Sequence, residues 1–518
     1  MEDVNFHAVL ICLAFLVSCL CLKVYHFIWW RPKKLEKSLK QQGIRGSPYK
    51  PLTGDMKEYI ALVTRAWSEP ISLSHHIVPR VDPFTDNIVR EYVKGIILLE
   101  WDKTQPYCYG PKVDKGSANQ QTRPHSKAST ESPHTNTYIR VDNSTRRKMG
   151  CTQENNQSCF PLRQAQGGMI PVFVKSSVML TEKWKKLRGD GERLERDVWP
   201  EFQELTGDVI SRTAFGSNYE EGKEILKLQK ELQLLVIETM QTLYVPGLRF
   251  IPTKKNRRRK VLDQTITSIL RNLVEIKARS MTERETNQDN LLSLLLRSNN
   301  ETNPQVSTSK LNMSMDDIVE ECKQFYLAGH ETTSSLLTWT AIVLAMHPDW
   351  QHKAREEVMQ LCGDTDPDAE VISHLKILNM ILLEVLRLYP PVIALYQHAH
   401  RKTKVGNLVI QAGIDLLLPI MLVNRDTDLW GDDAEQFKPE RFSEGVSKAC
   451  KDQTAFLPFG WGPKTCIGQN FAMIEAKVAL VMILKCFSLE LSASYARAPY
   501  TVMTLQPQHG AQIVMQLL

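Results

Sequence analysis

One cysteine, Cys466, stands in a segment crowded with glycine and proline, FLPFGWGPKTCIGQNFAMIEAK, which runs from Phe456 to Lys477. Such a segment cannot form regular helix or strand, so it predicts a bent loop whose backbone another group can approach closely. Apolar residues at helical spacing follow, which predicts a buried helix directly after the loop. A thiol there is poised to ionise, because a helix N-terminus favours negative charge. Considered alone, Cys466 is more simply explained as a structural cysteine in a turn.

A second stretch, FYLAGHETTSSLLTW, places polar residues inside a long apolar segment of helical spacing. Glu331 and Thr332 lie there beside the small residues Ala328 and Gly329. Polar side chains in a buried helix cost free energy unless they are paired, and small neighbours leave room for a ligand. An acid next to a hydroxyl can relay protons inward from solvent. The alternative is that the hydroxyls bond back to carbonyls of their own helix.

Two further stretches predict a buried cluster of charges. LLEVLRLYPP places Glu384 and Arg387 three residues apart on one helix face, and FKPERF offers Arg441 as a third partner. A charge pair among so many leucines must be satisfied inside the protein. The alternative, a solvated surface pair, is disfavoured by those leucines. We therefore expect these three residues to have a structural role.

The segments that carry these residues predict a mainly α fold with minor β. Helical spacing is almost continuous from Met169 to Met346, whereas short β patterns occur in VGNLVIQAGIDLLLPIMLV and in the tail QHGAQIVMQLL. Residues 51–518 are expected to form one large domain. Within it, residues 102–168 are polar and almost without apolar periodicity, so they cannot bury enough surface to offset their ordering entropy. We predict that this segment is disordered.

The N-terminus predicts a membrane anchor over residues 1–30. Its apolar run from Ala8 to Leu22 is broken only by Ser18 and, with its flanks, can span a hydrocarbon core of about 30 Å. Residues 31–50 are expected to form a basic linker, and positive charge at this place favours a cytosolic domain. A cleaved signal peptide is the alternative, but the residues before the run are acidic and no small-residue cleavage site follows.

Composition narrows the class of function. The net charge of +6 is mild for 518 residues and does not indicate nucleic-acid binding. The eleven cysteines are scattered without a C-x-x-C pair, which favours a reducing compartment over a disulfide framework or a zinc site.

Taken together, the four stretches resemble the cytochrome P450 family of haem-thiolate monooxygenases. Ala328 to Thr332 resembles the family's oxygen-binding helix, Glu384 and Arg387 match its E-x-x-R, and Arg441 matches the arginine of its P-E-R-F. ISRTAFGSNYEEGK, DLWGDDAEQFKPERF and TLQPQHG are similar to the plant branch that contains the seventy-two clan. The cysteine loop resembles the signature F-x-x-G-x-[RK]-x-C-x-G through Phe459, Gly462, Lys464, Cys466 and Gly468.

This resemblance implies a cofactor, partners and roles for residues. Cys466 would be the thiolate ligand of a haem iron, Thr332 would hold bound oxygen, and Glu331 would help to supply protons. O2 and electrons from NADPH, delivered by a membrane-bound cytochrome reductase, would be needed. The substrate would be a hydrophobic small molecule, hydroxylated in a pocket lined by residues 392–395. The family implies a single-pass protein of the endoplasmic reticulum membrane with a cytosolic catalytic domain.

The chain departs from the family pattern at positions expected near the haem carboxylates. Residues 102–168 stand where the family has a helix bearing W-x-x-x-R, and WKKLR, from Trp184 to Arg188, is interpreted as a coincidental match on a later helix. Gln397 and Asn424 stand where the family has arginine and histidine, and Lys464 where arginine is usual. Each lost charge-assisted hydrogen bond would weaken haem binding by about 1.5–3 kcal/mol.

Three functions compete at this point. The first is a haem- and O2-dependent monooxygenase acting on a hydrophobic small molecule. The second is a membrane-anchored pseudoenzyme or mis-spliced form that binds haem poorly. The third, a haem-thiolate isomerase or dehydratase that needs no reductase, is disfavoured by Glu331 and Thr332, because a peroxide rearrangement needs no oxygen-activating alcohol.

Overall fold

The computed structural model describes residues 2–51, 54–91, 97–102, 105–110, 162–216, 219–240, 252–283, 290–300, 314–405 and 408–518. Most of the segment predicted to be disordered, residues 102–168, therefore lies outside the described residues. At both of its ends the structure differs from the prediction. Residues 105–110 form a strand, and a helix begins at Leu162. The strand gains its backbone partners from a neighbouring strand over residues 97–102, a long-range contact that apolar periodicity does not report.

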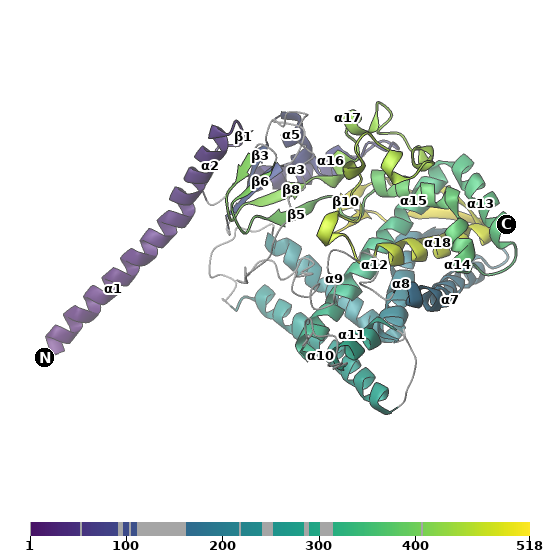
Figure 1. Cartoon of the computed structure of the whole chain (residues 1–518), viewed down its shortest axis with the longest axis horizontal. Helices are drawn as coiled ribbons and strands as arrows, with labels where there is room; N and C mark the ends of the chain where they lie inside the picture. Colours follow the sequence, from purple (N-terminus) through teal and green to yellow (C-terminus); the bar gives the residue numbers. More distant parts are fainter. Residues whose placement is uncertain are drawn as a thin grey trace, which may run out of the picture.

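Helices dominate the described part of the chain (Figure 1), which confirms the mainly α class. The longer helices are α1 (Glu2–Tyr25), α2 (Arg31–Gln41), α3 (Met56–Ser68), α5 (Pro83–Glu91), α7 (Leu162–Arg188), α8 (Val198–Ile210), α9 (Tyr219–Met240), α10 (Lys254–Glu283), α11 (Leu291–Asn300), α12 (Met315–Met346), α13 (Pro348–Cys362), α15 (Lys376–Leu388) and α18 (Gln469–Cys486). The short helical elements are η1 (His26–Trp30), α4 (Val78–Val81), η2 (Ser211–Phe215), α14 (Ala369–His374), α16 (Ile420–Val423), α17 (Thr427–Trp430), η4 (Pro439–Phe442), η5 (Val446–Lys448), η6 (Gln453–Ala455) and η7 (Gly462–Lys464).

The strands form small antiparallel sheets around the helices. One sheet has the order β1-β3-β2-β8-β5, a second has the order β4-β12-β9, and two hairpins pair β6 with β7 and β10 with β11. The strands are β1 (Arg45–Gly46), β2 (Ile97–Asp102), β3 (Gln105–Gly110), β4 (Arg193–Asp197), β5 (Leu395–His398), β6 (Thr403–Val405), β7 (Leu408–Ile410), β8 (Asp415–Leu418), β9 (Phe487–Leu491), β10 (Pro499–Thr501), β11 (Leu505–Pro507) and β12 (Gln512–Leu517).

Helix α12 runs through the middle of the domain and sets the positions of its neighbours (Figure 1). A capping box starts it: Ser314 Oγ accepts from Asp317 N at 3.1 Å, and Asp317 Oδ2 accepts from Ser314 N at 2.9 Å. From Thr333 to Leu344 every side chain is buried, so this part of the helix is surrounded by protein. Its apolar residues belong to one large core together with those of α15 and α18.

Gly329 lies in close contact with the end of α8. A Cβ atom added to Gly329 would lie 2.7 Å from Cδ1 and 3.1 Å from Cγ1 of Ile210, the last residue of α8. The space beside Gly329 is therefore filled by Ile210. The glycine allows close helix packing here, in contrast to the expectation that it leaves room for a ligand.

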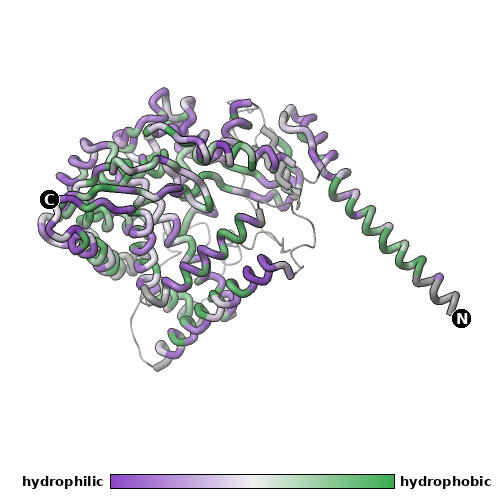
Figure 2. Tube along the Cα trace, turned by 180° about the vertical axis from the view of Figure 1, so that it is seen from behind, coloured by the Kyte–Doolittle hydropathy of each residue, from purple (hydrophilic) through white to green (hydrophobic). Residues whose placement is uncertain are grey.

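The N-terminal helices continue one another and leave the body as a rod (Figure 1), which is apolar over much of its length (Figure 2). Among the described residues, one helix is long and apolar enough to cross a membrane. The segment expected to be a linker is largely helix α2. Leu39 and Ile44 are buried against Ile410 and Ile414, and this apolar contact explains why the segment is ordered on the domain.

The contact between α8 and α12 can be tested by a double mutation. Gly329→Val should destabilise the protein by about 1–3 kcal/mol through overpacking, and Ile210→Ala by about 2–5 kcal/mol through loss of buried volume. Because the alanine makes room for the valine, the double mutant should lose clearly less than the sum of the two changes. Unfolding of the detergent-solubilised protein, followed by circular dichroism, measures these differences. Additive losses would show that the two side chains do not compete for the same space.

Candidate active site

The Cys466 loop obtains its shape from glycines in the left-handed region. Gly460 has φ of 72° and Gly462 has φ of 71°, a conformation that other residues rarely adopt. The turn is closed by a hydrogen bond from Cys466 N to Phe459 O at 2.7 Å. Helix α18 begins three residues after the cysteine, as predicted from the sequence. The loop thus places Cys466 just before the N-terminus of a long helix.

The Cys466 side chain is exposed, and a glycine stands two residues after it. A Cβ atom added to Gly468 would lie 3.9 Å from the Cys466 sulfur, so the glycine keeps this side of the thiol open. Phe459 packs against the main core and secures the base of the loop. On its other side the loop lies near β5, because a Cβ at Gly460 would lie 3.9 Å from Leu395 Cδ1.

Lys464 and Gln397 form a polar contact between this loop and β5. Lys464 Nζ donates to Gln397 Oε1 at 3.3 Å, and the lysine is exposed. Two other candidates for a cationic role near the loop are engaged elsewhere. Arg425 donates to the Leu388 carbonyl and pairs with Glu435 at 3.2 Å. His398 pairs with Asp415 at 2.5 Å.

Asn424 is fully buried beside the charge cluster described below. Its side-chain amide donates to the Arg387 carbonyl at 2.9 Å. It therefore holds the backbone of α15, and its own carbonyl accepts from Arg387 Nη1 at 2.8 Å.

The structure does not join Glu331 and Thr332 by a direct hydrogen bond between described atoms. Thr332 Oγ1 donates to Ala328 O of its own helix at 2.6 Å, which is the alternative considered from the sequence. The Glu331 carboxylate turns to the hairpin of β10 and β11, where Thr504 Oγ1 donates to its Oε1 at 3.0 Å and Gln506 Nε2 donates to the same oxygen. Burial raises the pKa of Glu331 although these two hydrogen bonds act in the opposite direction.

Thr504 and Gln506 were missed by the sequence analysis. They are 173 and 175 residues from Glu331 along the chain, and TLQPQHG indicated only the family. Neither residue has a local pattern that points to a carboxylate. Only the return of the C-terminal hairpin to α12 brings them together.

The side chains of Glu384, Arg387 and Arg441 lie together, and the first two are fully buried. Arg387 makes two parallel contacts with the carboxylate, Nε to Oε2 at 2.7 Å and Nη2 to Oε1 at 2.8 Å. Arg441 Nε lies 3.5 Å from Glu384 Oε1. The two-pronged geometry is the strong form of this ion pair, and it leaves further donors of Arg387 free to bind the backbone.

Arg387 uses those donors to hold the segment that leads toward the cysteine loop. It donates to the carbonyls of Asn424 at 2.8 Å, Ala434 at 2.6 Å and Gln436 at 3.0 Å. Lys438 N in turn donates to Glu384 Oε1 at 2.9 Å. The cluster thereby ties α15 to residues 424–438, in which α17 is a single short helix and Arg387 binds carbonyls outside it.

The WKKLR segment lies at the end of α7 and serves packing. Trp184 is fully buried, with its ring 6.1 Å from that of Phe202 and 5.8 Å from that of Phe487. Arg188 donates to the Gly191 carbonyl at 2.6 Å in the turn that follows. These contacts agree with the interpretation that the segment only mimics W-x-x-x-R.

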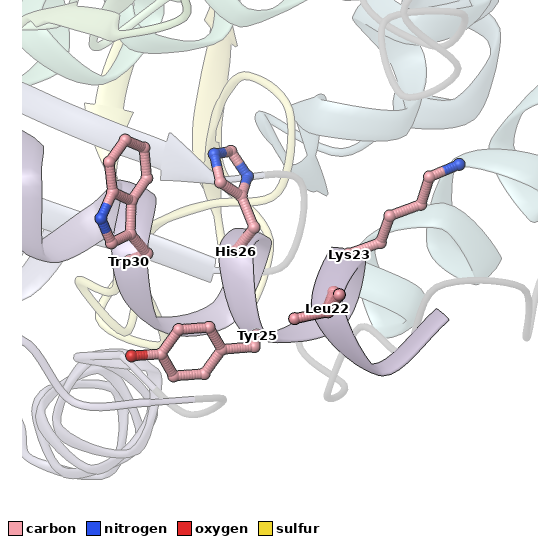
Figure 3. Close-up of a pocket in the computed structure, with 5 residues that line it drawn as sticks. All are labelled: Leu22, Lys23, Tyr25, His26 and Trp30. Carbon is pink, nitrogen blue, oxygen red and sulfur yellow. The ribbon is translucent and has the colours of Figure 1, made fainter. Parts of the chain in front are cut away.

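A hollow of about 650 Å³ lies beside the N-terminal rod, far along the chain from the residues above. Figure 3 shows that its walls come from α1 and η1 alone. His26 stacks on Trp30 with ring centroids 4.9 Å apart. Because one helical stretch supplies every lining residue, the hollow is a groove along the N-terminal rod.

Comparison with known proteins identifies the class of this chain. The family model for cytochrome P450 matches residues 120–515, so the chain belongs to the cytochrome P450 family. It is 41% identical to cytochrome P450 CYP72A219 of Panax ginseng over 98% of both chains, and 43% identical to cytochrome P450 CYP72A616 of Paris polyphylla over 95% of both. Secologanin synthase 1 of Catharanthus roseus is 39% identical over 97% of this chain and 96% of its own. The chain is thus a cytochrome P450 monooxygenase similar to plant members of the 72A group.

The residues present fit the haem-thiolate cofactor of this family. The loop offers an exposed thiol just before a helix N-terminus, and Gly468 adds no side chain beside it. Lys464 adds a cation two residues from the thiol, and its ammonium group faces the amide of Gln397. An exposed thiol with one cationic neighbour has the chemistry that a thiolate ligand of haem iron requires.

The charge cluster generates a stability prediction. Glu384→Ala should lower the free energy of unfolding by about 3–5 kcal/mol, because it leaves the buried Arg387 guanidinium uncompensated. Glu182→Ala is the matched control, since Glu182 belongs to an exposed ion pair with Lys185, for which about 0–1 kcal/mol is expected. Yield and melting temperature of both variants provide the measurement. A normal melting temperature for Glu384→Ala would refute the structural role of the cluster.

Proposed function

We propose that this chain hydroxylates a hydrophobic small molecule, with Cys466 as the thiolate ligand of a haem and with electrons supplied from NADPH by a cytochrome reductase. The observation that carries the proposal is the presentation of the Cys466 thiol by a glycine loop directly before α18. Phe459, Gly462 and Gly468 shape this loop, and Lys464 contributes its charge. Bound haem supplies O2 activation, which the thiolate ligand promotes by donating electron density to iron.

In this proposal Glu331 of α12 supplies protons and Thr332 of the same helix provides a hydroxyl group. Burial raises the pKa of Glu331, so its carboxyl retains a proton to higher pH than an exposed glutamic acid would. It gives up this proton toward the interior and takes another from solvent. Thr332 Oγ1, which donates to Ala328 O in the structure, offers a hydroxyl on the neighbouring helix position that can exchange this bond for one to a ligand.

The substrate site is proposed to lie along residues 392–395, between α15 and β5. Val392, Ile393 and Ala394 are apolar and only partly buried, so part of their surface can contact a bound ligand. Leu395 connects this segment to the cysteine loop through its approach to Gly460. An apolar lining of this kind selects for apolar ligands by removing their surface from water.

The N-terminal rod is proposed to anchor the protein in the endoplasmic reticulum membrane as a single span. Its apolar helix is followed by cationic residues at the start of α2, including Arg31, Lys33 and Lys34. Positive charge next to a span favours the cytosolic side, which places the catalytic domain beside a membrane-bound reductase.

Cys466→Ala should abolish the thiolate-type carbon-monoxide difference spectrum of the reduced protein, while membrane attachment is unchanged. The reason is that the sulfur ligand is lost but the anchor residues are untouched. Cys450→Ala is the matched control, because Cys450 lies nearby in sequence but outside the glycine loop. It should retain the spectrum. Persistence of the spectrum in Cys466→Ala would mean that another residue is the ligand.

Gln397→Arg should increase haem affinity about tenfold or more, because a guanidinium beside Lys464 adds a charge-assisted hydrogen bond for the haem carboxylates. Tyr396→Arg adds the same charge at the neighbouring position of β5, on the other face of the strand, and should not have this effect. Haem titration of both variants and of the parent chain measures the difference. The competing hypothesis of a poorly haem-binding chain predicts weak binding by the parent, and equal affinity for all three proteins would contradict the role given to position 397.

A further inference from the structure

Side chains spaced four residues apart on one face of α12 form hydrogen bonds with the C-terminal hairpin of β10 and β11. Ser335 Oγ donates to Leu505 O at 2.6 Å, and Trp339 Nε1 donates to the same carbonyl at 3.0 Å. One turn earlier on this face, Glu331 accepts from Thr504 and Gln506. Because residues at i, i+4 and i+8 share a helix face, the hairpin lies along α12, and Leu505 O is held by two donors of this face besides the contacts that the hairpin makes with Glu331.

The two oxygens of Glu331 have different surroundings. Oε1 receives both hydrogen bonds from the hairpin, and Gln506 Nε2 also lies 3.3 Å from Thr504 Oγ1. Oε2 lies 3.7 Å from His330 Nδ1. One oxygen is therefore held by neutral donors, while the other is directed to a second polar group.

His330 and Glu331 line the inner end of a cavity of about 250 Å³ between α8, α9 and α12. Its outer wall includes Lys223, Lys227 and Lys230 of α9, which are exposed. A cavity of this size with polar walls holds several water molecules. It joins the surface of the domain to a carboxyl that is itself nine-tenths buried.

We infer that Thr504 and Gln506 are positioning residues for proton supply, which hold the Glu331 carboxyl at the inner end of this cavity so that it is reprotonated from the cavity water. The inference rests on the proposed role of Glu331 as the proton-supplying acid. In each cycle the carboxyl O–H proton passes inward, and the carboxylate takes a proton from water in the cavity. The hairpin donors stabilise the carboxylate between these two events.

The charges around Glu331 decide the direction of the expected pH effect. Burial raises its pKa, whereas the bonds from Thr504 and Gln506 and the charge of Lys230 lower it. His330 is kept neutral, because burial lowers its pKa to about 4. Burial, and after it the charge of Glu331, raises the pKa of Tyr500 of β10. Removal of a hairpin donor therefore raises the pKa of Glu331 further.

The test uses the full-length protein reconstituted with an NADPH-dependent reductase, and the ratio of hydrogen peroxide released to NADPH consumed is followed against pH. Thr504→Val and Gln506→Met should each move the alkaline limb of this profile to higher pH by about one to two units. Thr504→Ser keeps the hydroxyl and should restore the parent profile. A second readout, the infrared titration of the carboxylic acid band that disappears in Glu331→Gln, should show the same shift without turnover.

Ser335→Ala is the matched control, because it removes a bond to the hairpin without removing one from Glu331. It should leave both readouts unchanged, and an equal shift would show that loosening of the hairpin is the cause and would overturn the inference. If Glu331→Gln alters the profile but Thr504→Val and Gln506→Met do not, the inference fails and the proposed role of Glu331 stands. If Glu331→Gln leaves the profile unchanged, the proposed role itself fails. The carbon-monoxide spectrum of each variant verifies that it is folded.

Discussion

Helix α12 carries several polar side chains into the interior, where an unpaired polar group costs free energy, because other elements surround the helix from Thr333 to Leu344. Two solutions are used. Thr338 and Thr340 donate back to Ser334 O and Leu336 O at 2.7 Å each. Ser335, Trp339 and Glu331 instead reach across to the C-terminal hairpin. The need to pair these side chains therefore determines where the last strands of the chain return to the domain.

The same requirement organises the route to the cysteine. Residues 424–438 lack a sheet or long helix to bind their carbonyls, and the Arg387 guanidinium supplies donors for three of them. Glu384 makes this possible by neutralising the arginine at 0% exposure. A buried ion pair contributes little net stability when it is compared with apolar packing. Here the ion pair serves to fix the backbone conformation, because the planar Arg387 guanidinium binds several separate turns of the chain that precedes the Cys466 loop.

The local features of this fold could be predicted from the sequence, and the long-range ones could not. The glycine loop before α18 and the spacing of Glu384 and Arg387 are local patterns, so both were recognised together with the family. The partners of Glu331 come from residues more than 170 positions away, and no local pattern announces them. The packing of α2 on the domain depends on the contact of Leu39 with Ile410 and Ile414, which the basic character of residues 31–50 does not indicate. The sequence pattern suggests that Gly329 leaves room for a ligand. In the structure Ile210 fills this space, and its approach depends on how α8 and α12 cross, which no local pattern shows.

The hairpin also connects the two halves of the candidate site. Leu505 accepts from Ser335 and Trp339 of α12 through its carbonyl, and its own N–H donates to Pro391 O at 2.9 Å. Pro391 directly precedes the apolar residues 392–395. One residue of β11 thus links the helix that bears Glu331 to the segment proposed to contact substrate. Since a displacement of the hairpin would leave both backbone groups of Leu505 without partners, it would change the setting of the acid and of the apolar lining together.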